Sequence, residues 1–159
     1  GGNYASSLVA QKEAYEHGCS QVLFTDAQTH SWLEELGGMN IFLVTADGRL
    51  LTPPTSGTIL DGITRDSILT LAPDLGLTPE VRPISLTELV DGVNSGAVVE
   101  AFACGTAAVV TPIARFLGEG IDASVAQQTG TATMAIRNRL LDIQYGRGDD
   151  PYGWSQKVC

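Results

Sequence analysis

A hairpin signal in the first third of the chain constrains the fold most strongly. The run Met39 to Thr45 (MNIFLVT) is apolar and β-prone, and it stops at Ala46-Asp47-Gly48-Arg49. Asp-Gly between two apolar runs is typical of a tight turn that joins antiparallel strands. We therefore expect the chain to return through Leu50-Leu51-Thr52 as the second strand of a hairpin.

Helical and β-prone patterns alternate irregularly along the rest of the chain. Apolar spacing and end signals predict helices at residues 4–17, 64–75, 85–94 and 131–145, and strands at residues 21–25, 80–84, 98–103 and 108–117. Ser85-Leu86-Thr87-Glu88 has the pattern of a capping box. We expect Trp154 to pack the C-terminal tail against the body. The irregular order favours a mixed α/β (α+β) fold over a regular doubly wound one.

Composition bounds the class of protein. The 159 residues suit a single domain over residues 1–159, and 43 % of them are hydrophobic, which is enough for a buried core. No run of about 18 apolar residues could cross a bilayer, so we expect no membrane contact. Eighteen acidic residues against nine basic ones give a net charge of −9, which would repel nucleic acid. Cys19, Cys104 and Cys159 lack metal-ligand and redox spacing, so we expect reduced thiols.

Two glycine-containing segments could each hold an anion. Asp61-Gly62-Ile63-Thr64-Arg65 leads a loop into a helix, where first-turn amides and the Thr64 hydroxyl could bind a phosphate. An ordinary turn in which Thr64 caps the helix explains the same residues. Ala103-Cys104-Gly105-Thr106-Ala107-Ala108 places small residues between two β-prone runs and could form a second cradle. A plain β-turn would have the same composition, so neither segment decides the matter alone.

The acids and histidines are less informative on their own. Glu34 and Glu35 precede a pair of glycines, and one of them could face a site, although most such pairs are solvated because burying an unpaired carboxylate is costly. His17 and His30 fall at a helix end and in a loop, and we expect both to be exposed. Neither lies beside an elbow-like serine motif, so a Ser-His-acid triad is not indicated.

Four blocks of the sequence, taken in order, carry a resemblance. They are Gly1-Gly2-Asn3-Tyr4-Ala5-Ser6-Ser7-Leu8; Glu35-Leu36-Gly37-Gly38-Met39-Asn40-Ile41-Phe42; Thr52-Pro53-Pro54 with Gly57-Thr58-Ile59-Leu60-Asp61-Gly62-Ile63-Thr64-Arg65; and Glu100-Ala101-Phe102 with Gly105-Thr106-Ala107. In order and spacing they resemble the branched-chain amino-acid aminotransferases, which are class IV pyridoxal-phosphate-dependent enzymes. The resemblance runs from Gly1 to about Trp154.

The resemblance implies the fold of the type IV pyridoxal-phosphate enzymes, with a small N-terminal domain, a larger C-terminal cofactor-binding domain and an active site at a homodimer interface. The chain looks like most of the larger domain. The small domain, with the arginine and tyrosines that the family draws from it, falls outside the 159 residues.

The resemblance also implies roles for individual residues toward pyridoxal 5'-phosphate. Tyr4 matches the tyrosine that hydrogen-bonds the phenolic oxygen, and Glu35 matches the carboxylate that keeps the pyridine nitrogen protonated, so that the ring can accept electrons. Phosphate-binding positions match Gly62, Ile63, Thr64, Gly105 and Thr106. Substrate-binding positions match Gly38, near the side-chain pocket, and Thr106 and Ala107, at the α-carboxylate. Arg65 could bind phosphate or stabilise its own loop.

The sequence departs from the family pattern in two places. Animal members have a Cys-x-x-Cys pair where this chain has Ala108 and Thr111, so we expect no thiol switch of that kind. The family's Schiff-base lysine would fall two residues before Gly1, and Lys12 and Lys157 match neither its position nor its context. We therefore expect no catalytic residue within the chain and no turnover by the 159 residues alone.

For the intact protein, the resemblance implies transfer of the amino group of leucine, isoleucine or valine to 2-oxoglutarate, giving branched 2-oxo acids and glutamate. The alternatives are another type IV enzyme, such as a D-amino-acid aminotransferase or an aminodeoxychorismate lyase, and a non-catalytic binding or assembly module. We expect small-molecule substrates, the N-terminal domain and a second copy as partners. We expect a cytoplasmic location, with a mitochondrial one left open because a transit peptide would precede Gly1.

Overall fold

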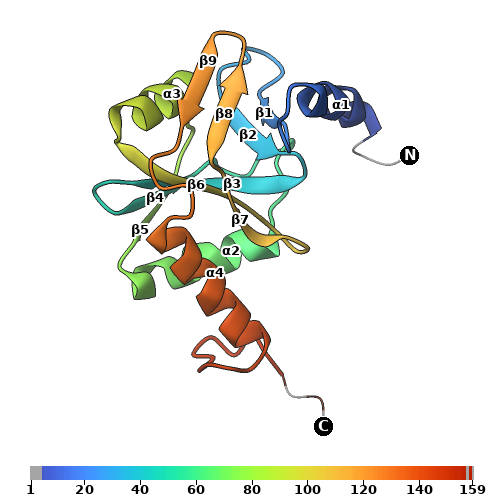
Figure 1. Cartoon of the computed structure of the whole chain (residues 1–159). Helices are drawn as coiled ribbons and strands as arrows, with labels where there is room; N and C mark the ends of the chain where they lie inside the picture. Colours follow the sequence, from blue (N-terminus) through green and yellow to red (C-terminus); the bar gives the residue numbers. More distant parts are fainter. Residues whose placement is uncertain (1–4, 157, 159) are drawn as a thin grey trace.

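A seven-stranded mixed sheet forms the centre of the computed structural model, which describes residues 5–156 and 158 (Figure 1). Its strands are β1 (Leu23–Thr25), β2 (Leu33–Leu36), β3 (Met39–Thr45), β4 (Arg49–Thr52), β5 (Thr78–Val81), β6 (Val98–Gly105) and β7 (Val109–Pro112). One edge of β3 pairs with β6 along almost its whole length. The other edge pairs first with β2 and then with β4, so a loop leaving β4 passes beside β2.

Helices and a separate hairpin cover the two faces of this sheet (Figure 1). Helix α2 (Ile63–Leu71), its 3-10 extension η2 (Ala72–Leu75) and α4 (Thr131–Gln144) lie on one face, and α3 (Leu86–Ser95) lies on the other with the hairpin of β8 (Arg115–Gly118) and β9 (Ile121–Ser124). Helix α1 (Leu8–Glu16) follows the short η1 (Ala5–Ser7) and buries no residue. None of the described helices is long and apolar enough to span a bilayer.

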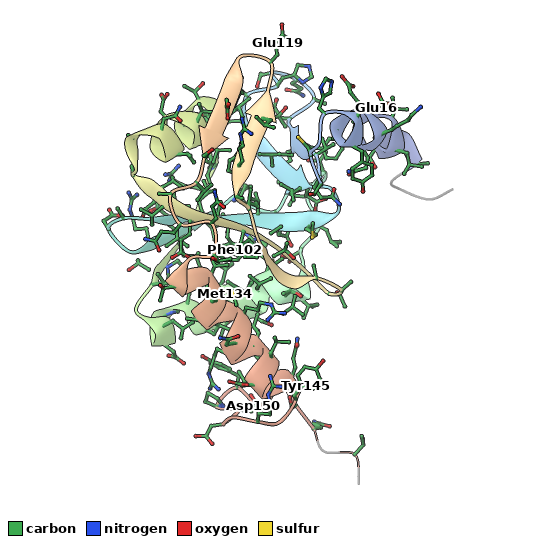
Figure 2. All side chains as sticks on the ribbon, viewed as in Figure 1. Glu16, Phe102, Glu119, Met134, Tyr145 and Asp150 are labelled. Carbon is green, nitrogen blue, oxygen red and sulfur yellow. The ribbon has the colours of Figure 1, made fainter. Side chains whose placement is uncertain are left out.

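Strand β3 is buried on both faces because its side chains alternate between two cores. Ile41 and Leu43 pack in the core beneath α3 and the β8–β9 hairpin, whereas Phe42 and Val44 pack in the core shared with α2 and α4. Phe42 stacks on Phe102, its direct neighbour on β6, with ring centroids 5.1 Å apart. Figure 2 shows Phe102 between the sheet and α4. The alternation fixes which residues face α2.

Several elements confirm the sequence predictions. The strand at residues 39–45 and the hairpin turn are as expected, with Gly48 in the left-handed region at a φ of 84°. The helix predicted at residues 4–17 is present as η1 and α1, apart from Tyr4, which lies outside the described residues. The helices predicted at 64–75, 85–94 and 131–145 are also present, within a residue or two at each end.

Other predicted strands were wrong in extent. Residues 108–117 form two strands, not one, because β7 ends at Pro112 and the chain then starts the β8–β9 hairpin. The strand predicted at 80–84 lies at 78–81, where it pairs in parallel with β4 and ends before Pro83, which has no N–H to donate. Strand β2 was not predicted as a strand, although it contains Glu35.

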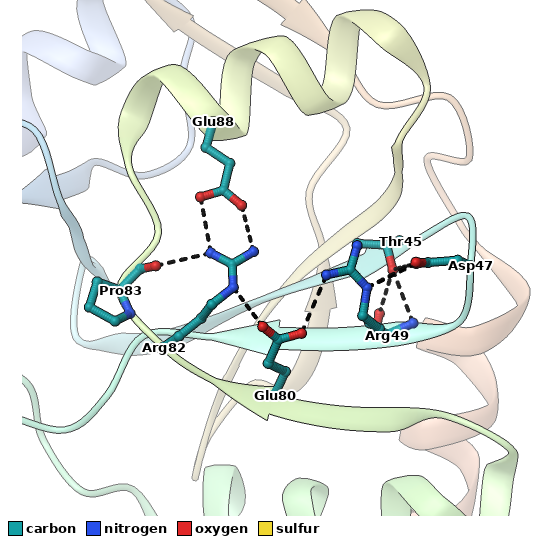
Figure 3. Close-up of polar contacts among 7 residues, drawn as sticks. All are labelled: Thr45, Asp47, Arg49, Glu80, Arg82, Pro83 and Glu88. Carbon is teal, nitrogen blue, oxygen red and sulfur yellow. Dashed lines mark hydrogen bonds and ion pairs between the residues drawn. The ribbon is translucent and has the colours of Figure 1, made fainter.

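Two local packing predictions were right only in part. The Ser85 hydroxyl accepts from the Glu88 amide at 3.0 Å, as in a capping box, but the Glu88 carboxylate pairs with Arg82 and does not reach back (Figure 3). In the C-terminal tail it is Tyr152 that packs on the body and donates to Asp74, while Trp154 stacks on the Tyr152 ring. The predicted contact of the tail therefore exists through a different aromatic residue.

Candidate active site

Glu35 is a buried carboxylate on β2 with one hydrogen-bond donor. Its side chain is 7 % exposed, and its Oε1 accepts from the Leu60 amide at 2.7 Å. No ion pair to Glu35 forms within the described part of the chain. Burial raises the pKa of Glu35, the Leu60 hydrogen bond opposes that rise, and the neighbouring Glu34 charge adds to it. A buried carboxylate of this kind is stabilised by a cationic partner.

The register of the sheet places the Glu35 carboxylate on the side of the two segments that we predicted to bind an anion, the cradles at residues 61–65 and 103–108. Glu35 lies opposite Asn40, Asn40 lies opposite Cys104, and Cys104 lies opposite Val110, so the four residues form one row across β2, β3, β6 and β7. Cys104 belongs to the core that faces α2 and α4. Since directly opposed residues share a face, Glu35 and Asn40 also project toward α2.

The N-terminus of α2 is one of these cradles. Gly62 is the N-cap residue and gives no side-chain cap, and the described part of the chain offers no acceptor to the amides of Ile63 and Thr64. A Cβ added to Gly62 would lie 2.3 Å from Oδ1 of Asn40, so only glycine fits against β3 at this point. Ile63 is 82 % exposed, so its side chain is not packed in the core. Exposed Asp66 brings one negative charge to this first turn.

Arg65 turns inward from the same helix turn. Its side chain is almost fully buried, donates to the Pro53 carbonyl at 3.0 Å and lies 3.7 Å from the Asp61 carboxylate. Its Nε has no hydrogen-bond partner among the residues that the structure describes. Of the two roles left open by the sequence, these contacts favour stabilising the loop, because they tie its two ends together. Burial raises the pKa of the Cys104 thiol to about 12, with the Arg65 charge opposing the rise, so this cysteine stays a neutral core residue.

The turn between β6 and β7 is the second cradle. Gly105 pairs with Val109, and Thr106 and Ala107 stand exposed in the turn between them. Met39 packs against Gly105, so that a Cβ added to Gly105 would lie only 3.3 Å from Cγ of Met39. Val109 adopts a positive φ of 56°, which a β-branched residue rarely does, so the turn is held in a strained conformation.

Gly38 lies in the neighbouring turn at this end of the sheet. The glycine pair Gly37-Gly38 joins β2 to β3, and the register of β3 against β6 places Met39 next to Gly105. The β2–β3 and β6–β7 turns therefore project from adjacent strands in the same direction. The structure thus brings Glu35, Gly38, Gly62, Ile63, Thr64, Gly105, Thr106 and Ala107 to one end of the sheet, while Tyr4 lies outside the described residues.

A cleft of about 620 Å³ opens beside Glu35. Its walls are Glu35 and the loop over residues 55–61, and Thr58 on that loop donates to Glu34 at 2.7 Å. The cleft does not reach Thr64 or Thr106. A larger hollow of about 880 Å³ lies between α1 and the β8–β9 hairpin and contains none of the predicted site residues.

Sequence reasoning gave no role to two residues that support the site. Asn40 donates to the Leu60 carbonyl at 2.9 Å, and Leu60 in turn holds Glu35 through its amide. The signal in the sequence is the amide side chain of Asn40 within an otherwise apolar strand, because a polar side chain buried there needs a partner. The partner itself, 20 residues away on a loop, has no such signal.

Comparison with known proteins shows the family to which the chain belongs. A family model described as amino-transferase class IV matches residues 1–116. The branched-chain-amino-acid aminotransferase of Mycobacterium tuberculosis is 48 % identical, in an alignment that covers 99 % of the chain and 44 % of that protein. The probable branched-chain-amino-acid aminotransferase of Streptomyces coelicolor is 46 % identical over all of the chain and again 44 % of its own length. The chain thus spans less than half the length of these relatives.

Solved structures show the same fold. The branched-chain amino acid aminotransferase from Escherichia coli superposes with a TM-score of 0.78 at 34 % identity, covering 97 % of the chain and 48 % of that protein. A branched-chain aminotransferase from Thermoproteus uzoniensis, solved with norvaline, gives a TM-score of 0.76 at 34 % identity and covers 92 % of the chain and 44 % of that structure. The mixed α/β fold expected from the sequence is therefore confirmed.

Proposed function

Because the chain belongs to the amino-transferase class IV family, we propose that the protein carrying it is a branched-chain-amino-acid aminotransferase. It would transfer the amino group of leucine, isoleucine or valine to 2-oxoglutarate and use pyridoxal 5'-phosphate as cofactor. The observation that carries the proposal is Glu35, a buried carboxylate that has no cationic partner among residues 5–156 and 158 and lies on the sheet face toward the N-terminal amides of α2. The names of the aligned relatives support the substrate class.

The residues present fit a phosphorylated pyridine ring. A protonated ring nitrogen would supply the cation that Glu35 lacks, and the amides of Ile63 and Thr64 are free to bind a phosphate. Gly62 is held so close to Asn40 that its backbone leaves no room for a side chain. When bound, the cofactor supplies an electron-accepting ring that makes the proton on the substrate Cα removable.

Each of the candidate site residues then has a defined role. Glu35 holds the proton on the pyridine nitrogen, because its negative charge favours the protonated form. The amides of Ile63 and Thr64 bind the phosphate at the helix end, and the Thr106 hydroxyl binds it from the facing turn. Ala107 shares with Thr106 the binding of the substrate α-carboxylate. Gly38 leaves space for a branched side chain, and Tyr4 would hold the phenolic oxygen.

Moving the proton at the substrate Cα requires an amine that the described residues do not place at the site. Lys12 is the one lysine in the described part of the chain, and it is exposed on α1, where it pairs with Glu16 at 3.9 Å. We propose that this amine, a smaller N-terminal domain and a second copy complete the active site of the whole protein. We also propose a cytoplasmic location for that protein, with a mitochondrial location as the alternative.

An activity panel on the full-length protein tests the proposal. With pyridoxal 5'-phosphate and 2-oxoglutarate, we expect glutamate to form from L-leucine, L-isoleucine and L-valine and not from D-alanine. Turnover of D-alanine without leucine would make the protein a D-amino-acid aminotransferase, and pyruvate release from aminodeoxychorismate would make it a lyase. Cofactor binding without any turnover would indicate a binding module.

A further inference from the structure

Asn40 is a buried polar residue whose two side-chain polar atoms both face the loop between β4 and α2. It is 6 % exposed and lies on β3, where the residues that follow it are apolar core residues. Its Nδ2 donates to the Leu60 carbonyl at 2.9 Å. Its Oδ1 packs against Gly62, at the position that a Cβ on Gly62 would occupy.

Leu60 is held by the sheet at both of its backbone groups. Its carbonyl accepts from Asn40 on β3, and its amide donates to Glu35 on β2. Glu35 and Asn40 are directly opposed in the β2–β3 pair, so the two side chains and the Leu60 peptide close a ring. The loop that carries Leu60 is otherwise largely exposed from Thr55 to Asp61, with Ile59 as its buried exception. The two sheet contacts therefore hold the Leu60 backbone at both its N–H and its C=O group.

We propose that Asn40 is a positioning residue of the aminotransferase site. By binding the Leu60 carbonyl it orients the Leu60 backbone, so that the Leu60 amide donates to Oε1 of Glu35 and Oε2 is left for the pyridine nitrogen. The inference rests on the proposed function and deepens it, because it names the group that orients the acid. The Asn40 side chain also packs against Gly62. It therefore links Glu35 to the N-terminus of α2, where the proposal places the phosphate.

The electrostatics of Glu35 give the positioning a measurable consequence. Burial raises the pKa of Glu35 and the Leu60 amide lowers it, so loss of that amide would raise the pKa further. A carboxyl that holds its own proton more tightly is a weaker partner for a protonated pyridine nitrogen. A role confined to folding would lower stability and leave this titration unchanged.

The test compares Asn40→Leu, which keeps the volume and removes both polar atoms, with Thr133→Val as a matched control. Thr133→Val also removes a buried side-chain hydrogen bond, to Glu100, in a part of the fold remote from the predicted site residues. Asn40→Ser is the second variant, should Asn40→Leu fail to fold. The titration of the Glu35 carboxyl is followed by NMR in the cofactor-free full-length protein, and the dissociation constant of pyridoxal 5'-phosphate, kcat and KM are then measured.

We expect the Asn40 variants to move the Glu35 midpoint upward, to weaken cofactor binding by about 10- to 100-fold and to lower kcat more than they raise KM. Thr133→Val should leave all four quantities unchanged at a comparable loss of stability. Asn40 variants that behave like Thr133→Val would overturn the positioning role. If the unaltered protein neither binds the cofactor nor transfers amino groups, the proposed function fails, while the cofactor-free titration still tests the link from Asn40 to Glu35.

Discussion

Two buried glutamates lie on the same face of the sheet, and their surroundings differ. Glu100 on β6 is 4 % exposed and accepts three hydrogen bonds, from the amides of Ala132 and Thr133 and from the Thr133 hydroxyl, at 2.7–3.1 Å. It thereby caps α4, whose N-cap residue, Gly130, has no side chain to do so. Glu35 is as deeply buried and accepts one hydrogen bond, from Leu60.

Under the proposed function, this difference distinguishes an acid that stabilises the fold, Glu100, from an acid that binds a ligand, Glu35. The first is satisfied by the protein, so its removal should lower stability. Among the described residues, Glu35 has no cationic partner and its Oε2 accepts no hydrogen bond, so its removal should lower function and not stability. Each prediction below tests or sharpens this contrast.

The largest expected effect is on catalysis by Glu35→Gln. Loss of a preorganised electrostatic partner of the reacting group costs about 100- to 1000-fold in kcat. Steady-state assays with L-leucine and 2-oxoglutarate on the full-length protein would measure it. An enzyme that keeps more than about half of its kcat after this substitution would remove Glu35 from the site.

Among the single substitutions that disturb Glu100, we expect Gly130→Ala to destabilise the fold most. An added Cβ would lie 1.8 Å from Cδ of Glu100, so the carboxylate must leave the α4 amides or the helix must shift. We expect a loss of about 3 kcal/mol in the free energy of unfolding, measured by urea denaturation. Gly57→Ala serves as a control for generic glycine effects, since a Cβ on Gly57 would meet nothing within 4 Å and its φ lies outside the left-handed region.

Glu100→Gln should cost less, because an amide oxygen can still accept from Thr133 while its NH₂ group faces the Ala132 amide. We expect a loss of about 2 kcal/mol in the same denaturation experiment. The cofactor dissociation constant should stay at the value of the unaltered protein. A selective loss of cofactor affinity would contradict the assignment of Glu100 to folding.

Glu35→Gln should instead raise stability, and in a pH-dependent way. Burial raises the pKa of Glu35 in the fold, so at pH values between the ordinary glutamate pKa and the raised one the folded protein binds a proton that the unfolded chain has released. The free energy of unfolding therefore falls as pH rises through that window. The variant lacks this loss, so its free energy of unfolding should rise relative to that of the unaltered protein across the window. The difference should persist at higher pH. Equal pH profiles for the two cofactor-free proteins would show that Glu35 is not strained by burial.

The smallest effect is expected at exposed charges that are already paired. On the β4–β5 edge, Arg82 binds Glu88 through two nitrogens and Glu80 through a third, and Arg49 binds Glu80 and Asp47 (Figure 3). Because these groups are partly exposed, Arg82→Met should cost about 0.5 kcal/mol, and about 1 M salt should shrink the difference. Urea denaturation at low and high salt would measure it. A loss that is large and independent of salt would mean that this network is desolvated.

Local patterns predicted part of the fold. The hairpin of β3 and β4 could be predicted because an apolar run, an Asp-Gly turn and a second apolar run lie next to one another in sequence. Strand β2 could not be predicted, because two of its four residues, Glu34 and Glu35, are acidic. It forms by pairing with β3 across the Gly37-Gly38 turn.

The site could be predicted only as separate residues. Resemblance to a family suggested Glu35, Thr64 and Thr106 as candidate site residues. The sheet register explains why Glu35 and the turn that holds Thr106 lie at one end of β2, β3 and β6, and the contact of Gly62 with Asn40 places the start of α2 there as well. The contacts that set their chemistry link distant positions, such as Asn40 with Leu60 and Glu100 with Thr133, 20 and 33 residues apart. No local pattern contains those pairings, because they depend on how the loop and α4 dock on the sheet.

The most direct test of the account is a crystal structure of the full-length protein with pyridoxal 5'-phosphate. The account predicts the pyridine nitrogen within about 3 Å of Oε2 of Glu35, with the phosphate bound by the amides of Ile63 and Thr64 and by the Thr106 hydroxyl. A ring whose nitrogen faces another group, or a phosphate bound away from α2, would contradict it.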